Sequence, residues 1–209
     1  MRNRIYVLLV TTLTAIILIC GYRITSVVIE DQKGKQETAK IVDRFLQSNG
    51  IAETNPDKEQ PEFDITYEID GVQTIGVIKI QELNVTAPIG YGIDEDTLQS
   101  HVGMYPDLDE PGKKGGVAAF AAHSSRAPVP AWYCFFQNLD DLEPGDEIEI
   151  IWNDGKTYEY EVMSVRSRLD PEDFSDFEAA PEKEKVVLQT CTDGQPYWRT
   201  YVRAVRKED

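Results

Sequence analysis

Cysteine and histidine are scarce in this sequence, with three cysteines and two histidines among 209 residues. Zinc sites usually take four nitrogen, sulfur or carboxylate ligands and place some of them in closely spaced pairs. No paired spacing occurs here, and Cys134 stands inside an aromatic run. The sequence therefore predicts no metal centre built from cysteine and histidine.

Positive charge and phosphate-binding loops are also in short supply. Lys and Arg total 21 against 37 Asp and Glu, so the formal net charge is −16. A surface this acidic repels phosphate backbones, and we therefore expect no nucleic acid partner. The glycines within residues 112–116 precede neither a Lys-Ser/Thr pair nor a helical pattern, so they do not indicate a nucleotide-binding loop.

One long uncharged run stands near the N-terminus. Residues 5–22 carry no charge, and their 18 residues are near the lower limit of length for a bilayer-spanning helix. Arg2 and Arg4 precede the run and Glu30 and Asp31 follow it, so the positive-inside rule predicts a cytoplasmic N-terminus and an extracellular remainder. A cleaved signal peptide has a similar start but a shorter apolar core and a small-residue cleavage site. We therefore predict a single-pass membrane anchor within residues 1–29.

The chain after this anchor divides into a stalk and a compact domain. Residues 30–49 carry apolar side chains near helical spacing and predict a solvated stalk helix that ends at Ser48-Asn49-Gly50. Residues 52–64 are rich in proline and charge, which is typical of a linker. We expect stalk and linker over residues 30–65 and one compact domain over residues 66–209.

Short apolar and β-branched runs follow one another through the compact domain. They predict strands at residues 76–80, 85–89, 117–123, 147–152, 156–165, 185–189 and 200–206. Asn153-Asp154-Gly155 is a strong hairpin signal, and Asp94 can cap one brief helix. Many short strands with few helices favour an all-β fold, a closed or nearly closed β-barrel.

Three residues with useful chemistry stand at predicted strand ends. His123 ends one strand, Cys191 ends the run VVLQTC, and Arg199 opens the last strand. A thiol becomes a nucleophile where an imidazole or a cation favours the thiolate, and a fixed guanidinium can stabilise an oxyanion. Together the three predict an acyl-transfer site. Taken singly, each also has a structural explanation: a buried thiol, a capping imidazole and a surface ion pair.

The remaining cysteines and histidine have simpler interpretations. Cys134 lies among aromatic residues, which predicts a small buried side chain, and Cys20 lies in the anchor. An exported chain can hold a disulfide between Cys134 and Cys191, but a domain of this size folds without one. His101 follows a short polar helix and is expected to be exposed or in a turn.

Five segments, in order along the chain, resemble those of the sortases, which are membrane-anchored cysteine transpeptidases. LQTC at 188–191 resembles the family signature, RTYVRAV from Arg199 the strand of the catalytic arginine, and AAFAAHSS the strand of the catalytic histidine. The flanking segments IGVIKIQELNVTAPIGYGIDEDTLQSHVGMYP and FFQNLDDLEPGDEIEI resemble the entry strands and the later Gly-Asp segment. The resemblance spans residues 74–206. It departs from type-B enzymes, because residues 169–184 are too few for their helical insertion.

This resemblance implies an eight-stranded sortase-type β-barrel that follows an N-terminal transmembrane helix. Cys191 would attack a threonine-like carbonyl in an LPxTG-type sorting signal, His123 would exchange protons with the leaving and entering amines, and Arg199 would stabilise the tetrahedral intermediate. Thr190 would contact the substrate. The implied partners are surface proteins with a C-terminal sorting signal, an amine of a peptidoglycan precursor or a pilin, and the lipid bilayer. No cofactor is implied.

Two other functions remain open on the residues alone. One is a thiol peptidase that uses water as the acceptor, and the other is an inert membrane-tethered barrel that binds extended peptides. Some sortases bind calcium, and oxygen ligands suit that ion. The carboxylates available for it are Asp170, Glu172, Asp173, Asp176 and Glu178. A solvated acidic face is the commoner outcome in so acidic a chain.

Overall fold

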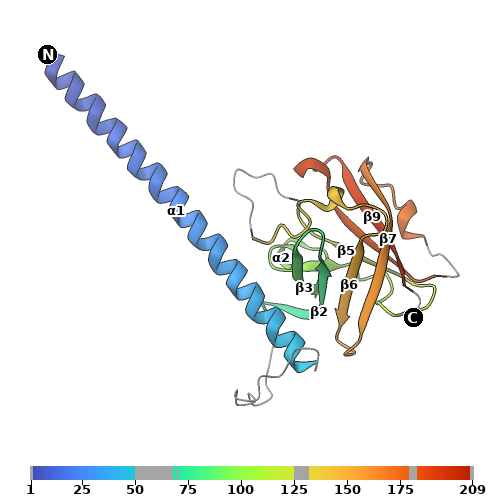
Figure 1. Cartoon of the computed structure of the whole chain (residues 1–209). Coiled ribbons are helices and arrows are strands. Elements are labelled where there is room, and N and C mark those ends of the chain that lie inside the picture. Colours follow the sequence, from blue (N-terminus) through green and yellow to red (C-terminus); the bar gives the residue numbers. More distant parts are fainter. Residues whose placement is uncertain (1, 50–67, 70, 125–131, 179–182, 208–209) are drawn as a thin grey trace.

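Nine strands and one long helix account for most of the residues that the computed structural model describes, which are 2–49, 68–69, 71–124, 132–178 and 183–207 (Figure 1). The helices are α1 (Arg2–Ser48) and α2 (Glu95–Leu98). The strands are β1 (Glu68–Ile69), β2 (Val72–Ile80), β3 (Val85–Tyr91), β4 (Val102–Met104), β5 (Val117–Ala121), β6 (Glu147–Trp152), β7 (Thr157–Leu169), β8 (Lys185–Cys191) and β9 (Arg199–Arg206). The predicted linker at residues 52–64 lies outside the described residues.

Strands β2 to β9 form a closed, eight-stranded barrel, which confirms the predicted fold. Neighbouring strands follow the order β2-β3-β4-β5-β8-β9-β7-β6, and β6 pairs again with β2 to close the sheet. The two-residue strand β1 extends β2 on one side. Two neighbouring pairs are parallel, β3 with β4 and β5 with β8. Closure leaves the eight strands without an open edge.

Most predicted strands appear within a few residues of their expected bounds. The hairpin at Asn153-Asp154-Gly155 joins β6 to β7, and Gly155 has the positive φ of 77° that such a turn requires. The Asp94 side chain accepts a hydrogen bond from the Thr97 amide and so caps α2, as predicted. The strands β1 and β4 were not predicted, because two or three residues are too few to show alternation.

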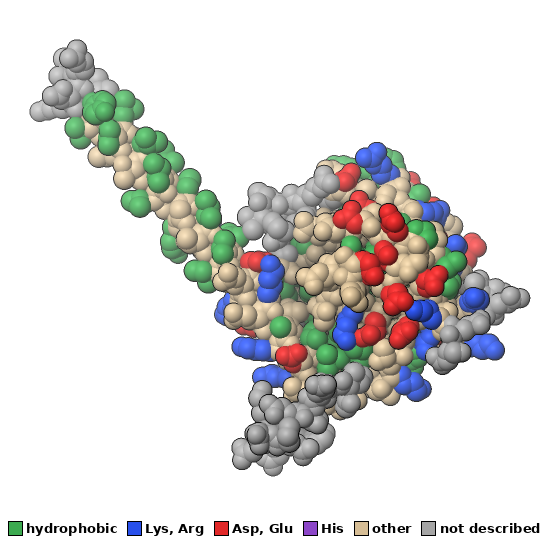
Figure 2. Space-filling view, viewed as in Figure 1, with side chains coloured by type: hydrophobic (Ala, Val, Ile, Leu, Met, Phe, Trp, Pro, Cys, Tyr) green, Lys and Arg blue, Asp and Glu red, His purple; other side chains and the backbone are tan. Residues whose placement is uncertain are grey.

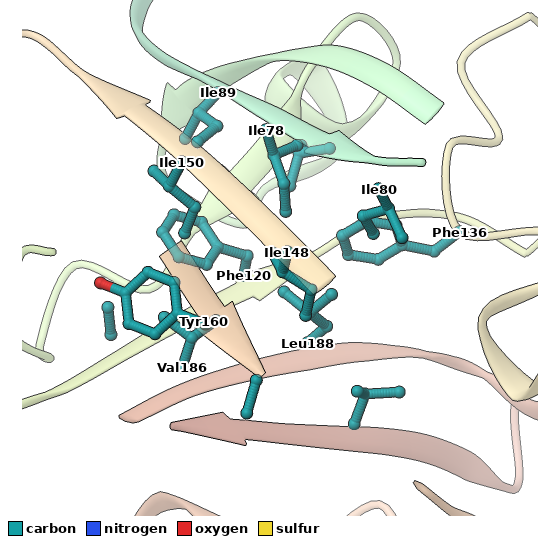
Figure 3. Close-up of a cluster of buried hydrophobic side chains, with 14 of the residues drawn as sticks. Ile78, Ile80, Ile89, Phe120, Phe136, Ile148, Ile150, Tyr160, Val186 and Leu188 are labelled. Atoms are coloured by element: carbon teal, nitrogen blue, oxygen red, sulfur yellow. The ribbon is translucent and has the colours of Figure 1, made fainter. Parts of the chain in front are cut away.

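The barrel interior holds the main hydrophobic core (Figure 3). Alternation along each strand sends every second side chain inward. In β8, for example, Val186 and Leu188 lie in this core, whereas Val187 belongs to a separate cluster on the outer face. Leu188 is fully buried together with Phe120 of β5 and Ile150 of β6. The inward side chains therefore stabilise the barrel, and functional side chains can stand on the outer face of the same strands.

The long helix α1 has an exposed apolar half and a half that packs on the barrel (Figures 1 and 2). Its N-terminal part is apolar and long enough to cross a membrane by length and composition, and none of the described residues in its most apolar 18-residue window is buried. Its C-terminal part buries Val42 and Phe45 against Val77 of β2 and Ile151 of β6. The expectation of a wholly solvated stalk is therefore wrong for this face, because its apolar residues meet an apolar patch on the barrel.

Acidic side chains gather on the face of the barrel shown in Figure 2. Glu147 and Glu149 of β6 lie directly opposite Glu161 and Glu159 of β7 in the antiparallel register. Like charges in direct opposition destabilise a strand pair. Lys79 partly offsets this charge through an ion pair of 2.8 Å with Glu149. Carboxylates therefore predominate on this face, and the absence of a nucleic acid partner stays a prediction.

Candidate active site

Three strand ends converge at one rim of the barrel and bring the predicted acyl-transfer residues together. Cys191, the last residue of β8, is the direct antiparallel partner of Arg199, the first residue of β9. Strand β5 runs parallel to β8 with Ala121 beside Gln189. Continuing this register by two residues brings His123 level with Cys191. The sheet topology therefore places all three residues on adjacent strand ends.

Cys191 and Arg199 also share the outer face of the sheet. Cys191 follows Val187 and Gln189 at two-residue intervals, and Val187 belongs to the outer cluster. Arg199 likewise stands two residues before Tyr201, which belongs to that cluster too. Since side chains two residues apart in a strand point to the same face, Cys191 and Arg199 project away from the core. Cys191 is half-buried and its thiol is free.

The guanidinium of Arg199 is fixed beside the sulfur. Its Nη1 atom lies 3.5 Å from Cys191 Sγ and donates to the carbonyl oxygens of Pro196 at 2.9 Å and Trp198 at 3.3 Å. The turn between the two strands contains Asp193 in the left-handed region, with φ 55°, which aspartate tolerates better than most residues. The Arg199 cation is thereby held where negative charge would develop on sulfur or on a carbonyl oxygen.

His123 is half-buried and its ring is bounded on two sides. The Tyr133 ring meets the imidazole edge-on, with 5.8 Å between centroids and 61° between planes. The Glu95 carboxylate of α2 lies 4.0 Å from His123 Nε2. The backbone is anchored as well, because His123 O accepts from the Phe136 amide at 3.2 Å. The orientation of the imidazole is thus constrained by Tyr133 and Glu95.

Two side-chain hydrogen bonds tie the histidine segment to the cysteine strand. The Ser124 hydroxyl donates to the backbone carbonyl of Cys191. The Thr190 hydroxyl donates to the carbonyl of Ala122 at 2.7 Å. Thr190 is 5% exposed and alternates with Cys191, so its side chain points to the opposite face. Its observed partner is backbone, and the substrate contact expected of Thr190 stays a prediction.

A polar network on the same outer face was not anticipated. The Tyr105 hydroxyl donates to Gln189 Oε1, and Gln189 Nε2 donates to the Tyr201 hydroxyl at 3.0 Å. Burial raises the pKa of Tyr105 to about 12, with a further upward contribution from Tyr201 and an opposing one from Arg199. Burial also raises the pKa of Tyr201, so both tyrosines stay neutral hydrogen-bonding groups near Cys191 and Arg199. Gln189 and Tyr201 stand two residues from Cys191 and Arg199, and that alternation was the available clue.

His101 corrects one expectation. It is fully buried, with Nε2 3.0 Å from the Thr74 hydroxyl and Nδ1 2.7 Å from the Ser100 hydroxyl. Burial lowers the pKa of His101 to about 4. The imidazole is therefore neutral and structural, and it is buried and not exposed, although His101 does lie in a bend directly after the turn at residues 99–100. Cys134 is buried and free, as predicted.

The acidic segment after β7 uses its carboxylates within the protein. Asp170 and Asp173 accept hydrogen bonds from the amides of Glu172 and Ser175. Asp176, 6% exposed, accepts from Arg166 through both Nε at 3.0 Å and Nη2 at 2.5 Å. Within the described part of the chain, no group of three or more His, Cys, Asp or Glu side chains could hold a metal ion. The calcium site remains a prediction without support from this geometry.

Comparison with known protein families identifies the family of this chain. Residues 78–207 match the family model described as Sortase domain, which is more than half of the chain. The protein therefore belongs to the sortase family, a family of cysteine transpeptidases.

Individual relatives agree with this assignment. The chain is 29% identical to Sortase D of Bacillus subtilis (strain 168) over 119 residues, which cover 57% of this chain and 54% of that protein. The chain thus matches about half the length of this curated relative. Sortase A from Corynebacterium diphtheriae, as a lid mutant, is similar with a TM-score of 0.59 and 25% identity over 82% of this chain and 94% of that one. A pilus-related Sortase C of Group B Streptococcus shares the fold, with a TM-score of 0.59 and 24% identity over 85% and 91% of the two chains.

Proposed function

We propose that this protein is a membrane-anchored cysteine transpeptidase that cleaves an LPxTG-like sorting signal and joins the cleaved protein to an amine. The observation that carries the proposal is the cross-strand pair of Cys191 and Arg199, with His123 level with them on the adjacent strand end. The acceptor would be an amine of a peptidoglycan precursor or of a pilin. The partners would be surface proteins that carry a C-terminal sorting signal.

The first half-reaction forms a thioester. Cys191 attacks the scissile carbonyl carbon as a thiolate, and the carbonyl oxygen takes up the negative charge. Arg199 stabilises this oxyanion with its fixed donors. The carbon–nitrogen bond then breaks while His123 gives its proton to the leaving amine. The acyl group stays on Cys191 and the C-terminal fragment departs.

The second half-reaction reverses the proton transfer. The acceptor amine attacks the thioester carbon and loses a proton to His123, and the carbon–sulfur bond breaks to regenerate the Cys191 thiolate. The new amide joins the surface protein to the acceptor. Every proton and electron pair is accounted for by these groups, so we expect no cofactor to be required.

The location follows from helix α1. Its exposed apolar part would span the bilayer once, and Arg2 and Arg4 would keep the N-terminus in the cytoplasm. The barrel would then lie on the extracellular side, where sorting signals and cell-wall amines meet. We favour a general protein-anchoring enzyme. Because the chain is similar to Sortase D, a function like that of Sortase D is the alternative to test.

The test uses the full-length chain in nanodiscs, incubated with a fluorogenic LPxTG-type peptide with and without an amine. We expect cleavage by the wild type, a thioester adduct in intact-mass spectra, and no cleavage by Cys191→Ala. Cys20→Ala is the matched control, because it removes an exposed thiol from α1. Equal behaviour of wild type and Cys191→Ala across a peptide library would leave an inert peptide-binding barrel. Cleavage without amine product would indicate a peptidase, and the library identifies the preferred motif.

A further inference from the structure

Helix α1 reaches the active site through one glycine. Buried positions recur along its C-terminal half at Gly34, Thr38, Val42 and Phe45, which is the spacing of one helix face. The Trp132 indole, 11 residues beyond the end of β5, lies against this face at Gly34, so closely that a Cβ on residue 34 would overlap the ring. A glycine inside a helix costs about 1 kcal/mol relative to alanine. The close contact with the Trp132 indole, which leaves no room for a Cβ, therefore explains why residue 34 is a glycine.

From Trp132 an aromatic contact continues to the histidine. The Trp132 and Tyr133 rings meet edge-on, with centroids 5.7 Å apart and planes at 82°. The Tyr133 ring in turn meets His123 edge-on at 5.8 Å. Edge-to-face pairs of this kind have a preferred geometry, so movement of one ring changes the position of the next. Gly34, Trp132, Tyr133 and His123 thus form a continuous line of packed groups.

Tyr133 also lies within electrostatic reach of both helices. Burial raises the pKa of its phenol, and smaller upward contributions come from Cys134, then Glu95 of α2 and Glu30 of α1. Glu95 is the same carboxylate that lies 4.0 Å from His123 Nε2. The imidazole therefore contacts a ring that packs towards α1 and lies near a carboxylate of α2.

We propose that Tyr133, braced by Trp132 against Gly34 of α1, is a positioning residue for His123, so that the membrane-proximal helix supports the catalytic histidine. The inference rests on the proposed function of His123 as proton donor and acceptor. Proton transfer needs the imidazole within hydrogen-bond reach of the reacting amine. A misplacement of about 1 Å can cost about 100-fold in rate. The brace would therefore act on the rate of the chemical steps and little on peptide binding.

The continuity of α1 adds a spatial consequence. Gly34 lies 12 residues beyond Tyr22, the end of the uncharged run, or about 18 Å along a helix. Because α1 is a single helix from Arg2 to Ser48, the contact at Gly34 would hold the active site at a defined distance from the bilayer. A barrel cut free of α1 would lose this support while retaining its core.

The experiment compares two glycine substitutions in the same helix of the full-length protein in nanodiscs. Gly34→Ala adds a methyl group against the indole, whereas Gly21→Ala adds one where nothing lies within 4 Å. We expect Gly34→Ala and Trp132→Ala to lower kcat about 10-fold or more with KM nearly unchanged. Gly21→Ala should match the wild type. Tyr133→Phe should retain most of the rate, since it keeps the ring, and Tyr133→Ala should not.

A second readout does not depend on activity. The chain has two histidines, so selective ¹³C labelling gives one signal for His123 and one for His101 as an internal reference. Gly34→Ala and Trp132→Ala should shift the His123 signal and leave that of His101 in place. If the His123 signal is the same in Gly34→Ala as in Gly21→Ala, the brace does not exist. Absence of cleavage by the wild type would instead remove the proposed function, and the spectra would still decide the contact.

Discussion

Thr190 and Ala122 are joined by a hydrogen bond of 2.7 Å, from the Thr190 hydroxyl to the Ala122 carbonyl, between the strand that ends at Cys191 and the segment that carries His123. The bond is buried and belongs to the side chain that points away from Cys191. It therefore connects the strand of Cys191 to the segment of His123 through the residue that precedes each of them, on the face opposite to the Cys191 side chain. Its removal should affect both stability and the alignment of the site.

Thr190→Val is the first prediction. The substitution keeps the shape of the side chain but leaves the Ala122 carbonyl without this donor, which costs about 1–3 kcal/mol. We expect a lower free energy of unfolding in urea and a reduced kcat, while Thr190→Ser, which retains the hydroxyl, stays closer to the wild type. If Thr190 instead acts through substrate contact, Thr190→Val will raise KM and leave the unfolding curve unchanged.

Arg199 provides the second prediction. Its Nη1 atom contacts Cys191 Sγ and two backbone carbonyls, and a lysine cannot reproduce this fixed planar arrangement. Loss of an oxyanion donor typically lowers kcat about 100- to 1000-fold. We expect Arg199→Ala to show a loss of this size in peptide cleavage and Arg199→Lys to recover only a part of it.

Arg203→Ala is the matched control for this arginine. Arg203 lies on the same face of β9, four pairs further along the register from the Cys191–Arg199 pair, and is exposed. Four residues of strand separate it from Arg199, a distance of about 13 Å. An equal loss in Arg203→Ala and Arg199→Ala would mean that general charge, and not the contact with Cys191, accounts for the effect.

Residues at strand ends were predictable where local pattern and chemistry coincide. Cys191 and Arg199 each adjoin an alternating run, and pairing of those two runs in a hairpin is enough to bring them opposite each other. Burial of His101 was not predictable, because its partner Thr74 is 27 residues away in the sequence. Gly34 and Trp132 are still further apart in the sequence. A glycine inside a polar helix does not indicate which side chain packs against it.

His101 leads to a prediction about pH. Its pKa is lowered to about 4 in the folded protein, from an ordinary value of about 6.5, because burial disfavours the charged form. Between these values the unfolded chain binds more protons than the folded one, so stability rises with pH across this window. The contribution of His101 is complete above about pH 6.5 and is lost as pH falls towards 4, a change of about 3 kcal/mol.

Urea unfolding at several pH values checks this sign. His101→Gln cannot titrate, so the difference between wild type and variant should narrow as pH falls from 6.5 to 4, while carboxylate effects are common to both proteins. The histidine ¹³C signals give the pKa directly. A His101 signal that titrates near pH 6.5 in the folded protein would contradict the prediction.

Asp176 gives the last prediction, which separates an ion pair from a calcium site. Its carboxylate accepts two hydrogen bonds from Arg166 and is nearly buried, and the next residue, Phe177, packs edge-on against Tyr105 and Tyr201. Asp176→Asn should therefore lower the free energy of unfolding by about 1–3 kcal/mol and slow peptide cleavage through the displaced aromatic ring. The exposed Glu172→Gln, in the same segment, should do neither. Calcium that binds only the folded protein must raise its melting temperature. Because Asp170, Asp173 and Asp176 already accept hydrogen bonds from backbone amides or Arg166, we expect the Tm of the wild type to be the same with calcium and with a chelator. A rise in Tm that Asp176→Asn abolishes would assign the segment to calcium instead.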